Sequence, residues 1–168
     1  MAAAFNQFVQ QEKGRAGVVA TPCQALALAK MKLYKDKDET GRIKQLQLVI
    51  GLYCGWTLSA EKFSALLARK NIKADEIKRM DIPAGEKMLE IYAREGVKEI
   101  PLDEAQACIR EACNYCADST AEYADVSVGA ARFAGTADEQ RGWNQLIVRS
   151  EKGRELINLA TKQGVLEI

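Results

Sequence analysis

The stretch QLQLVIGLY, residues 45–53, is apolar at nearly every position and is followed directly by Cys54 and Gly55. A short run with apolar residues on both alternating faces is typical of a strand that is buried on both sides, as in parallel sheets. We therefore expect residues 45–53 to form a central strand. A second short apolar run, residues 17–20, precedes it and is also expected to be a strand.

Helix-starting residues follow each of these two strands. Thr21 is suited to the N-cap of a helix and Pro22 to its first position, so we expect a helix that ends near Tyr34. Ser59 opens a second expected helix, which ends near Lys70. The order strand–helix–strand–helix favours an α/β fold with a mixed, mainly parallel central sheet and flanking helices.

The rest of the chain is expected to add peripheral elements to one domain over residues 1–168. Further helices are expected over residues 3–13, 102–112 and 150–163, a hairpin from 77–82 and 87–92, strands over 125–128 and 143–148, and loops over 35–41 and 130–142.

Composition excludes several classes of function. Lys and Arg number 24 and Asp and Glu 23 among 168 residues, so the net charge of +1 gives no electrostatic case for binding nucleic acid. Histidine is absent, which rules out Ser-His-Asp and Cys-His catalysis and every histidine metal ligand. The N-terminal residues carry no export signal and no apolar stretch is long enough for a membrane span, so we expect a reducing, cytoplasmic location.

Five cysteines carry most of the chemical information. Cys113 and Cys116 form a C-x-x-C pair, which can chelate a metal or act as a dithiol. Cys23 and Cys54 each follow the carboxyl end of an expected parallel strand, where sites usually lie in α/β sheets. A set of four thiolates without histidine fits an iron–sulfur cluster or a structural zinc ion. Cys23 and Cys54 taken singly also fit small buried side chains, and Cys108, on an amphipathic helix, is expected to be a core residue.

Charged residues and glycines after the C-x-x-C pair allow two interpretations. Asp118, Glu122 and Asp125 fit either a capping cluster or hydrogen bonds to a cofactor, and on a short helix Asp118 and Glu122 would share a face. Three arginines in the segment that follows could contact phosphates or lie at the surface. They are Arg132, Arg141 and Arg149. The glycines match no nucleotide-binding fingerprint, and turn geometry explains them.

Four segments together resemble one family. They are VATPCQ (19–24), IGLYC (50–54), CNYCAD with AEYADVSVG (113–118 and 121–129), and GWN with VR and Gly153 (142–153). In this order they are similar to the C-terminal region of the β subunits of coenzyme F₄₂₀-reducing hydrogenase and F₄₂₀-linked formate dehydrogenase.

The resemblance implies a flavin- and iron–sulfur-containing subunit of an anaerobic, archaeal redox complex. FAD would exchange a hydride with coenzyme F₄₂₀, the substrate, and pass electrons to a 4Fe–4S cluster on Cys23, Cys54, Cys113 and Cys116. It also implies cofactor contacts from motif residues: Thr21, Gly51, Asp118, Glu122, Asp125, Ser127, Gly129 and Arg149. No residue is assigned a catalytic role. The expected partners are hydrogenase, formate dehydrogenase or heterodisulfide reductase subunits in a hetero-oligomer, with neither nucleic acid nor a membrane span.

The chain departs from the family in two respects, in the loop over residues 129–141, which is poorer in glycine than the family's version, and in the region before the T-P-C-Q segment. Family members usually carry about a hundred further residues before the T-P-C-Q segment, close to a whole domain. The flavin site is therefore expected to be completed by a partner chain or lost. Two other functions stay open, a zinc-binding scaffold and a dithiol oxidoreductase that uses Cys113 and Cys116.

Overall fold

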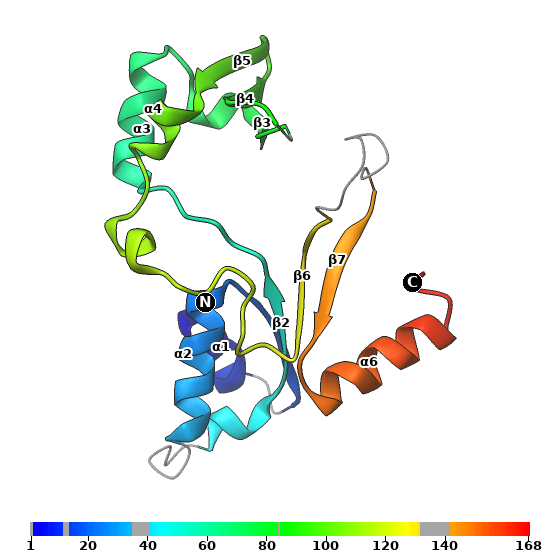
Figure 1. Cartoon of the computed structure of the whole chain (residues 1–168). Coiled ribbons are helices and arrows are strands. Elements are labelled where there is room, and N and C mark those ends of the chain that lie inside the picture. The colour runs from blue at the N-terminus through cyan, green and yellow to red at the C-terminus, as the bar shows by residue number, and fades with distance from the viewer. Residues whose placement is uncertain (1, 12–13, 35–40, 84, 132–141) are drawn as a thin grey trace. The chain divides into compact units, whose positions relative to one another are not determined.

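The computed structural model describes residues 2–11, 14–34, 41–83, 85–131 and 142–168 (Figure 1). Contacts among residues group the chain into two compact units: unit 1 is Met1–Gly55 with Ala117–Ile168, and unit 2 is Trp56–Cys116. The single domain expected over 1–168 stays a prediction. Most of the two expected loops, 35–41 and 130–142, lies outside the described residues, as do Arg132 and Arg141.

Unit 1 contains a four-stranded sheet with the strand order β1-β2-β6-β7. The strands are β1 (Ala16–Ala20), β2 (Leu46–Leu52), β6 (Val126–Ala130) and β7 (Asn144–Val148). β2 pairs in parallel with both β1 and β6, and β7 is an antiparallel edge strand. The expected central strand and the mixed, mainly parallel sheet are therefore confirmed.

The described helices of unit 1 are α1 (Ala2–Gln11), α2 (Pro22–Leu33) and α6 (Glu151–Lys162), with a short 3-10 helix, Arg42–Gln45, before β2. Two of these three helices, α2 and α6, begin directly after Thr21 and Ser150, which lie at their N-caps. At the start of α2 the backbone N–H of Thr21 donates to the Gln24 side chain over 3.0 Å. At the start of α6 the Ser150 hydroxyl accepts from the backbone N–H of Gly153 over 3.1 Å. These bonds satisfy helix-end groups that have no partner within the helix.

One face of the sheet in unit 1 is covered. Buried residues of α1 and α2, among them Phe5 and Leu28, join Val49 of β2 in a single apolar cluster. A segment of turns, residues 121–124, lies directly on β2 at Gly51. A Cβ added to Gly51 would lie only 2.4 Å from the Cβ of Ala121. Glycine at this position is therefore required by the close approach of the two segments.

Unit 2 is a three-stranded antiparallel sheet with two helices. Its elements are α3 (Ala60–Arg69), β3 (Ile77–Asp81), β4 (Met88–Ala93), β5 (Gly96–Pro101), α4 (Leu102–Gln106) and two short 3-10 helices, Ala74–Glu76 and Glu111–Tyr115. The expected hairpin is confirmed as β3 with β4, and β5 extends it. Leu66, Ile91 and Ile100 are fully buried in its core.

The expected helix over residues 102–112 is wrong in its second half. α4 ends at Gln106 because the following residues pair with the segment that precedes α3. The backbone N–H of Ser59 donates to the Cys108 carbonyl over 2.8 Å, and that of Arg110 donates to the Thr57 carbonyl over 2.9 Å. These long-range hydrogen bonds replace the helical ones.

Candidate cofactor site

Cys23 and Cys54 lie at the carboxyl ends of two neighbouring parallel strands, as the sequence predicts. Ala20, the last residue of β1, pairs in register with Gly51 of β2. Cys23 is the second residue of α2, and its sulfur lies 3.4 Å from the hydroxyl oxygen of Thr21. The expected contact residue Thr21 is thus next to a thiol that is itself exposed.

Backbone hydrogen bonds fix the end of β2 at Cys54. The N–H of Tyr53 donates to the Val128 carbonyl, and the N–H of Cys54 donates to the Ser119 carbonyl, both over 2.9 Å. The second bond ties the thiol-bearing residue to the segment that follows the C-x-x-C pair. Cys54 therefore occupies a defined position and remains partly accessible.

A cavity of about 390 Å³ opens beside Cys54 within unit 1. Its lining includes Tyr53, Cys54, Ser119, Thr120, Gly129 and Gln145. The Tyr53 hydroxyl is buried and has no hydrogen-bond partner among the described residues. A buried polar group without a partner is costly, so this hydroxyl is an unusual feature of a residue that lines the cavity.

Gly129 is one of the expected cofactor contacts, and its neighbour is the Tyr53 ring. A Cβ added to Gly129 would lie 2.2 Å from the Cδ2 atom of Tyr53. The absence of a side chain at Gly129 thus makes room for the ring. Sequence reasoning missed Tyr53, although a hydroxyl-bearing aromatic directly before Cys54 at a strand end was a usable signal.

Asp118 shapes the segment between the C-x-x-C pair and β6. Its carboxylate accepts from the backbone N–H groups of Thr120 and Glu122, each over 3.0 Å. The segment consists of turns, so the short helix on which Asp118 and Glu122 would share a face is wrong. The reason is that this carboxylate satisfies backbone donors locally, which competes with helix formation. Glu122 itself is exposed.

Arg149 and Ser127 hold the same segment from the sheet side. The Arg149 guanidinium donates from Nε to the Ser127 hydroxyl over 3.1 Å and from Nη2 to the Thr120 hydroxyl over 2.8 Å. The fully buried Ser127 hydroxyl in turn donates to the Ala121 carbonyl over 3.1 Å. These two expected cofactor contacts therefore position Thr120, which lines the cavity.

Asp125 joins β2 to the start of α6. Its Oδ2 accepts from the backbone N–H of Val49 over 2.8 Å, and its Oδ1 accepts from the Ser150 hydroxyl over 2.6 Å. Both oxygens of this expected cofactor contact thus have protein partners. Asp125 acts here as a cross-link within the fold.

The C-x-x-C pair belongs to unit 2. Cys113 lies in the 3-10 helix Glu111–Tyr115 and Cys116 directly follows it. The Cys113 thiol contacts the Thr57 carbonyl at 3.9 Å and is partly accessible, while Cys116 is exposed. Because the pair does not open an α-helix, the dithiol oxidoreductase gains no support from this geometry.

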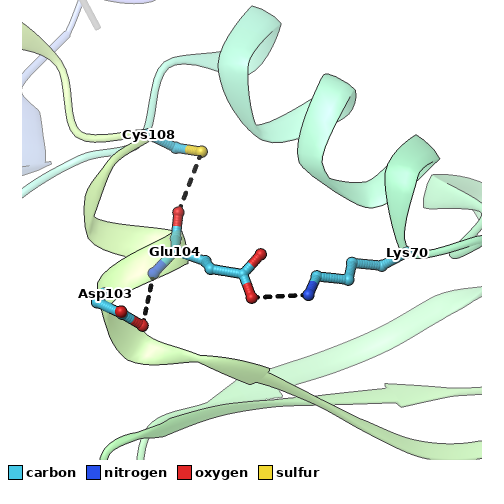
Figure 2. A network of polar contacts seen from close by, with 4 residues as sticks. All are labelled: Lys70, Asp103, Glu104 and Cys108. Carbon is cyan, nitrogen blue, oxygen red and sulfur yellow. Dashed lines mark hydrogen bonds and ion pairs between the residues drawn. The ribbon is translucent and has the colours of Figure 1, made fainter.

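Cys108 differs from the other four cysteines. Only 5% of its surface is exposed, and its thiol donates to the Glu104 carbonyl over 3.6 Å (Figure 2). Glu104 also forms an ion pair with Lys70 at 2.7 Å, and its backbone N–H donates to Asp103. The expectation that Cys108 is a core residue is confirmed.

Accessibility thus separates Cys108 from the other four cysteines. None of the five forms a disulfide; Cys23 and Cys116 are exposed, Cys54 and Cys113 are partly exposed, and Cys108 is buried. Within the described ranges, no group of three or more Cys, Asp or Glu residues is arranged to hold a metal ion. No helix in this part of the chain is long and apolar enough to cross a membrane.

The fold is shared with a known oxidoreductase. It matches a chain of the F₄₂₀-reducing NiFe hydrogenase complex of Methanosarcina barkeri with a TM-score of 0.73 and 23% identity, over 89% of this chain and 49% of that one. This likeness shows that the two chains share a mixed α/β fold.

The family model for the C-terminal region of the coenzyme F₄₂₀ hydrogenase/dehydrogenase β subunit matches residues 13–168. The chain therefore belongs to the family of coenzyme F₄₂₀ hydrogenase and dehydrogenase β subunits, as its motifs predict.

Named relatives agree with this membership. The chain is 32% identical over 155 residues to the coenzyme F₄₂₀ hydrogenase β subunit of Methanococcus voltae, a match that covers 91% of this chain and 51% of that protein. It is also 32% identical over 162 residues to the F₄₂₀-dependent sulfite reductase of Methanocaldococcus jannaschii, over 90% of this chain and 24% of that enzyme. The chain thus spans about half the length of the first relative and about a quarter of the second.

Proposed function

We propose that this chain is an electron-transferring subunit of an F₄₂₀-dependent redox complex. In this proposal Cys23, Cys54, Cys113 and Cys116 bind a 4Fe–4S cluster, and FAD binds with the help of unit 1. The complex is cytoplasmic and anaerobic, and its other members are subunits of hydrogenase, formate dehydrogenase or heterodisulfide reductase type. The relatives are named for their use of F₄₂₀, and that dependence is carried over here as part of the proposal.

The accessibility of the thiols is the observation that carries the proposal. The four cysteines that the family resemblance implies as ligands are exposed or partly exposed, and the fifth is buried. A thiol must reach the ion to ligate it, whereas a buried cysteine is normally part of a core. Thiolates are also the usual ligands of iron–sulfur clusters.

The cavity beside Cys54 is the proposed place for part of the flavin. Its lining residues include Ser119 and Thr120, which carry hydroxyls, and Gln145, which carries an amide. Polar groups of this kind suit the oxygen and nitrogen atoms of a flavin ring or its side chain. When bound, a flavin exchanges two electrons as hydride and a cluster takes one at a time.

Several residues of this chain hold the cavity wall and the Cys54 thiol in place. Arg149, Ser127 and Asp118 fix the segment that carries Ser119 and Thr120, and Ser119 fixes Cys54. We propose that the expected cofactor contacts act mainly in this way, by holding the cavity wall and the thiol in place. Exclusion of water around the thiols would then be the second contribution of the protein.

Metal analysis of the anaerobically purified chain tests the proposal. About four irons per chain, with the broad visible absorbance of a cluster, are expected. Cys23→Ala, Cys54→Ala, Cys113→Ala and Cys116→Ala should each lose most of the iron. Cys108→Ala is the matched control and should keep it, because its thiol is buried and hydrogen-bonded elsewhere. Iron that is retained in the four variants would refute the ligand set.

A zinc-binding scaffold is the second candidate, since four cysteines without histidine also suit structural zinc. One zinc and no iron per chain, lost in the same four variants, would replace the redox function by this one.

A further inference from the structure

The first turn of α2 brings a hydroxyl group close to the thiol of Cys23. The side-chain oxygen of Thr21 and the sulfur of Cys23 lie 3.4 Å apart, which is within hydrogen-bond distance for a sulfur atom. In this contact either atom can be the donor. The two residues are separated only by Pro22, so the contact is a local feature of unit 1.

The start of the helix holds Thr21 in position. Its backbone N–H donates to the Gln24 side chain over 3.0 Å, and its carbonyl accepts from the N–H groups of Gln24 and Ala25 over 3.0 and 2.8 Å. Pro22, which follows Thr21, has a fixed φ angle. The branched Cβ of threonine also restricts its χ1 angle. The turn therefore presents the hydroxyl to the sulfur in a preorganised way.

A hydroxyl differs from a carbonyl in what it can do for a sulfur atom. The thiols of Cys108 and Cys113 contact backbone carbonyls, and such contacts need the S–H proton because a carbonyl only accepts. A cysteine that ligates a metal is a thiolate and has no proton to donate. The Thr21 hydroxyl can rotate and donate to the sulfur instead. Its contact with Cys23 can thus outlast the loss of the thiol proton.

We propose that the Thr21 hydroxyl donates a hydrogen bond to the Cys23 thiolate and thereby raises the reduction potential of the cluster that this thiolate ligates. The inference rests on the proposed function, in which Cys23 is one of four ligands. Hydrogen bonds to the sulfur atoms are among the factors that set the potential of an iron–sulfur cluster. Reduction adds negative charge, which a donor stabilises more strongly than it stabilises the oxidised state. Thr21 is a positioning residue in this account, because it acts through Cys23.

The backbone at the start of α2 acts on the same sulfur atom and is separable from the hydroxyl. Cys23 is the second residue of the helix, where the partial positive charge of the N-terminus favours an anion. That contribution comes from backbone groups, and the helix-start bonds of Thr21 use its N–H and its carbonyl. A substitution that changes only the Thr21 side chain therefore leaves the contribution of the helix in place.

The exposure of Cys23 sets the size of the effect. Because Cys23 is exposed, water competes with the hydroxyl as a hydrogen-bond donor. We therefore expect the hydrogen bond to change the equilibrium constant for reduction by roughly threefold to tenfold. For a one-electron couple, a tenfold change corresponds to about 59 mV.

Potentiometry of the anaerobically purified chain, followed by electron paramagnetic resonance, tests the proposal. Thr21→Val removes the hydroxyl and keeps the branched side chain. It should retain about four irons per chain and lower the reduction potential. Thr21→Ser keeps a hydroxyl and should restore the potential of the unaltered chain. Electron–nuclear double resonance in H₂O and D₂O should show an exchangeable proton that is lost in Thr21→Val and kept in Thr21→Ser.

Thr161→Val is the matched control. The Thr161 hydroxyl donates to the Ile157 carbonyl within α6 over 2.9 Å, so the same substitution removes a hydroxyl that bonds to a carbonyl and not to a sulfur atom. It should leave the potential and the iron content unchanged. Thr21→Ala is a second variant without the hydroxyl, for the case in which valine prevents the cluster from binding, and it should also lower the potential.

Failure of this inference is distinguishable from failure of the proposed function. An unaltered chain without iron would refute the proposed function, and the inference would fall with it. Iron in the unaltered chain, with equal potentials for that chain and Thr21→Val, would overturn the hydrogen bond alone. An equal shift in Thr161→Val would do the same. So would loss of iron from both Thr21→Val and Thr21→Ala, because the hydroxyl would then serve to bind the cluster and not to set its potential.

Discussion

Replacement of Gly51 by alanine should destabilise the protein through close packing, in spite of the higher strand propensity of alanine. The new methyl group would lie 2.4 Å from the Cβ of Ala121 and 2.9 Å from the Cβ of Ala124. Both neighbours are short side chains on a segment held by hydrogen bonds, so neither can rotate away. The backbone of residues 121–124 must shift instead.

The magnitude follows from two opposing effects. Overpacking of a buried site costs about 1–3 kcal/mol. Removal of glycine from the unfolded chain returns about 0.4–1 kcal/mol. Gly51→Ala should therefore lower the free energy of unfolding by about 1–2 kcal/mol. Gly17→Ala is the matched control, because it lies in the neighbouring strand β1 and its added Cβ meets no atom within 4 Å. It should be neutral or slightly stabilising.

Urea unfolding, followed by circular dichroism, measures the difference. The double variant Gly51→Ala with Ala121→Gly should recover about 1 kcal/mol, since it removes the closest contact and relieves the left-handed backbone of Ala121, whose φ is +55°. Equal stabilities for Gly51→Ala and Gly17→Ala, or no recovery in the double variant, would refute this account of the packing.

Three further variants test other parts of the fold. Asp125→Ala removes hydrogen bonds to the Val49 N–H and the Ser150 hydroxyl and should cost about 3 kcal/mol in urea unfolding, whereas Asp81→Ala, at an exposed ion pair, should cost under about 1 kcal/mol; equal costs would contradict the cross-link. Gly153→Ala places a Cβ 2.2 Å from the Asp125 carbonyl oxygen and should increase hydrogen exchange in α6; unchanged exchange would show that α6 does not depend on this contact. The hydrogen bond to Glu90 raises the pKa of Tyr92 above its ordinary value of about 10, so the stability that this bond supplies is complete below that pH and is lost as the pH rises through the raised pKa. Glu90→Ala should lower the pKa of Tyr92 in an absorbance titration, with Tyr92→Phe identifying the signal; an unchanged titration would exclude Glu90 as the cause.

Local signals explain why most elements of the fold were predictable. Thr21 with Pro22 and Ser150 start helices through bonds to residues only three positions away, and the apolar run of β2 needs no distant partner to be recognised. β5 was missed because its side chains are mostly exposed and only Ile100 is fully buried. The end of α4 depends on bonds to residues 57–59, which no local pattern encodes.

The sequence also predicted part of the candidate site, namely the positions of its cysteines. Strand ends identified Cys23 and Cys54, and Cys108 was correctly assigned to the core although the helix expected to carry it ends at Gln106. The cavity beside Cys54 was not predictable, because it depends on the fit between Gly129 and the Tyr53 ring across two strands. The roles of Asp118 and Arg149 were also hidden, since a capping carboxylate and a cofactor-binding one look alike in sequence.

The hydrogen bonds of Asp118, Asp125, Ser127 and Arg149 have a consequence for how this motif evolves. Each of these side chains is engaged by the chain's own backbone or hydroxyl groups. Selection for folding alone would therefore preserve them in a descendant that had lost its thiols and, with them, the proposed electron-transfer role. The polar residues of the motif would then indicate common descent, and only the cysteines would indicate whether the proposed chemistry has been kept.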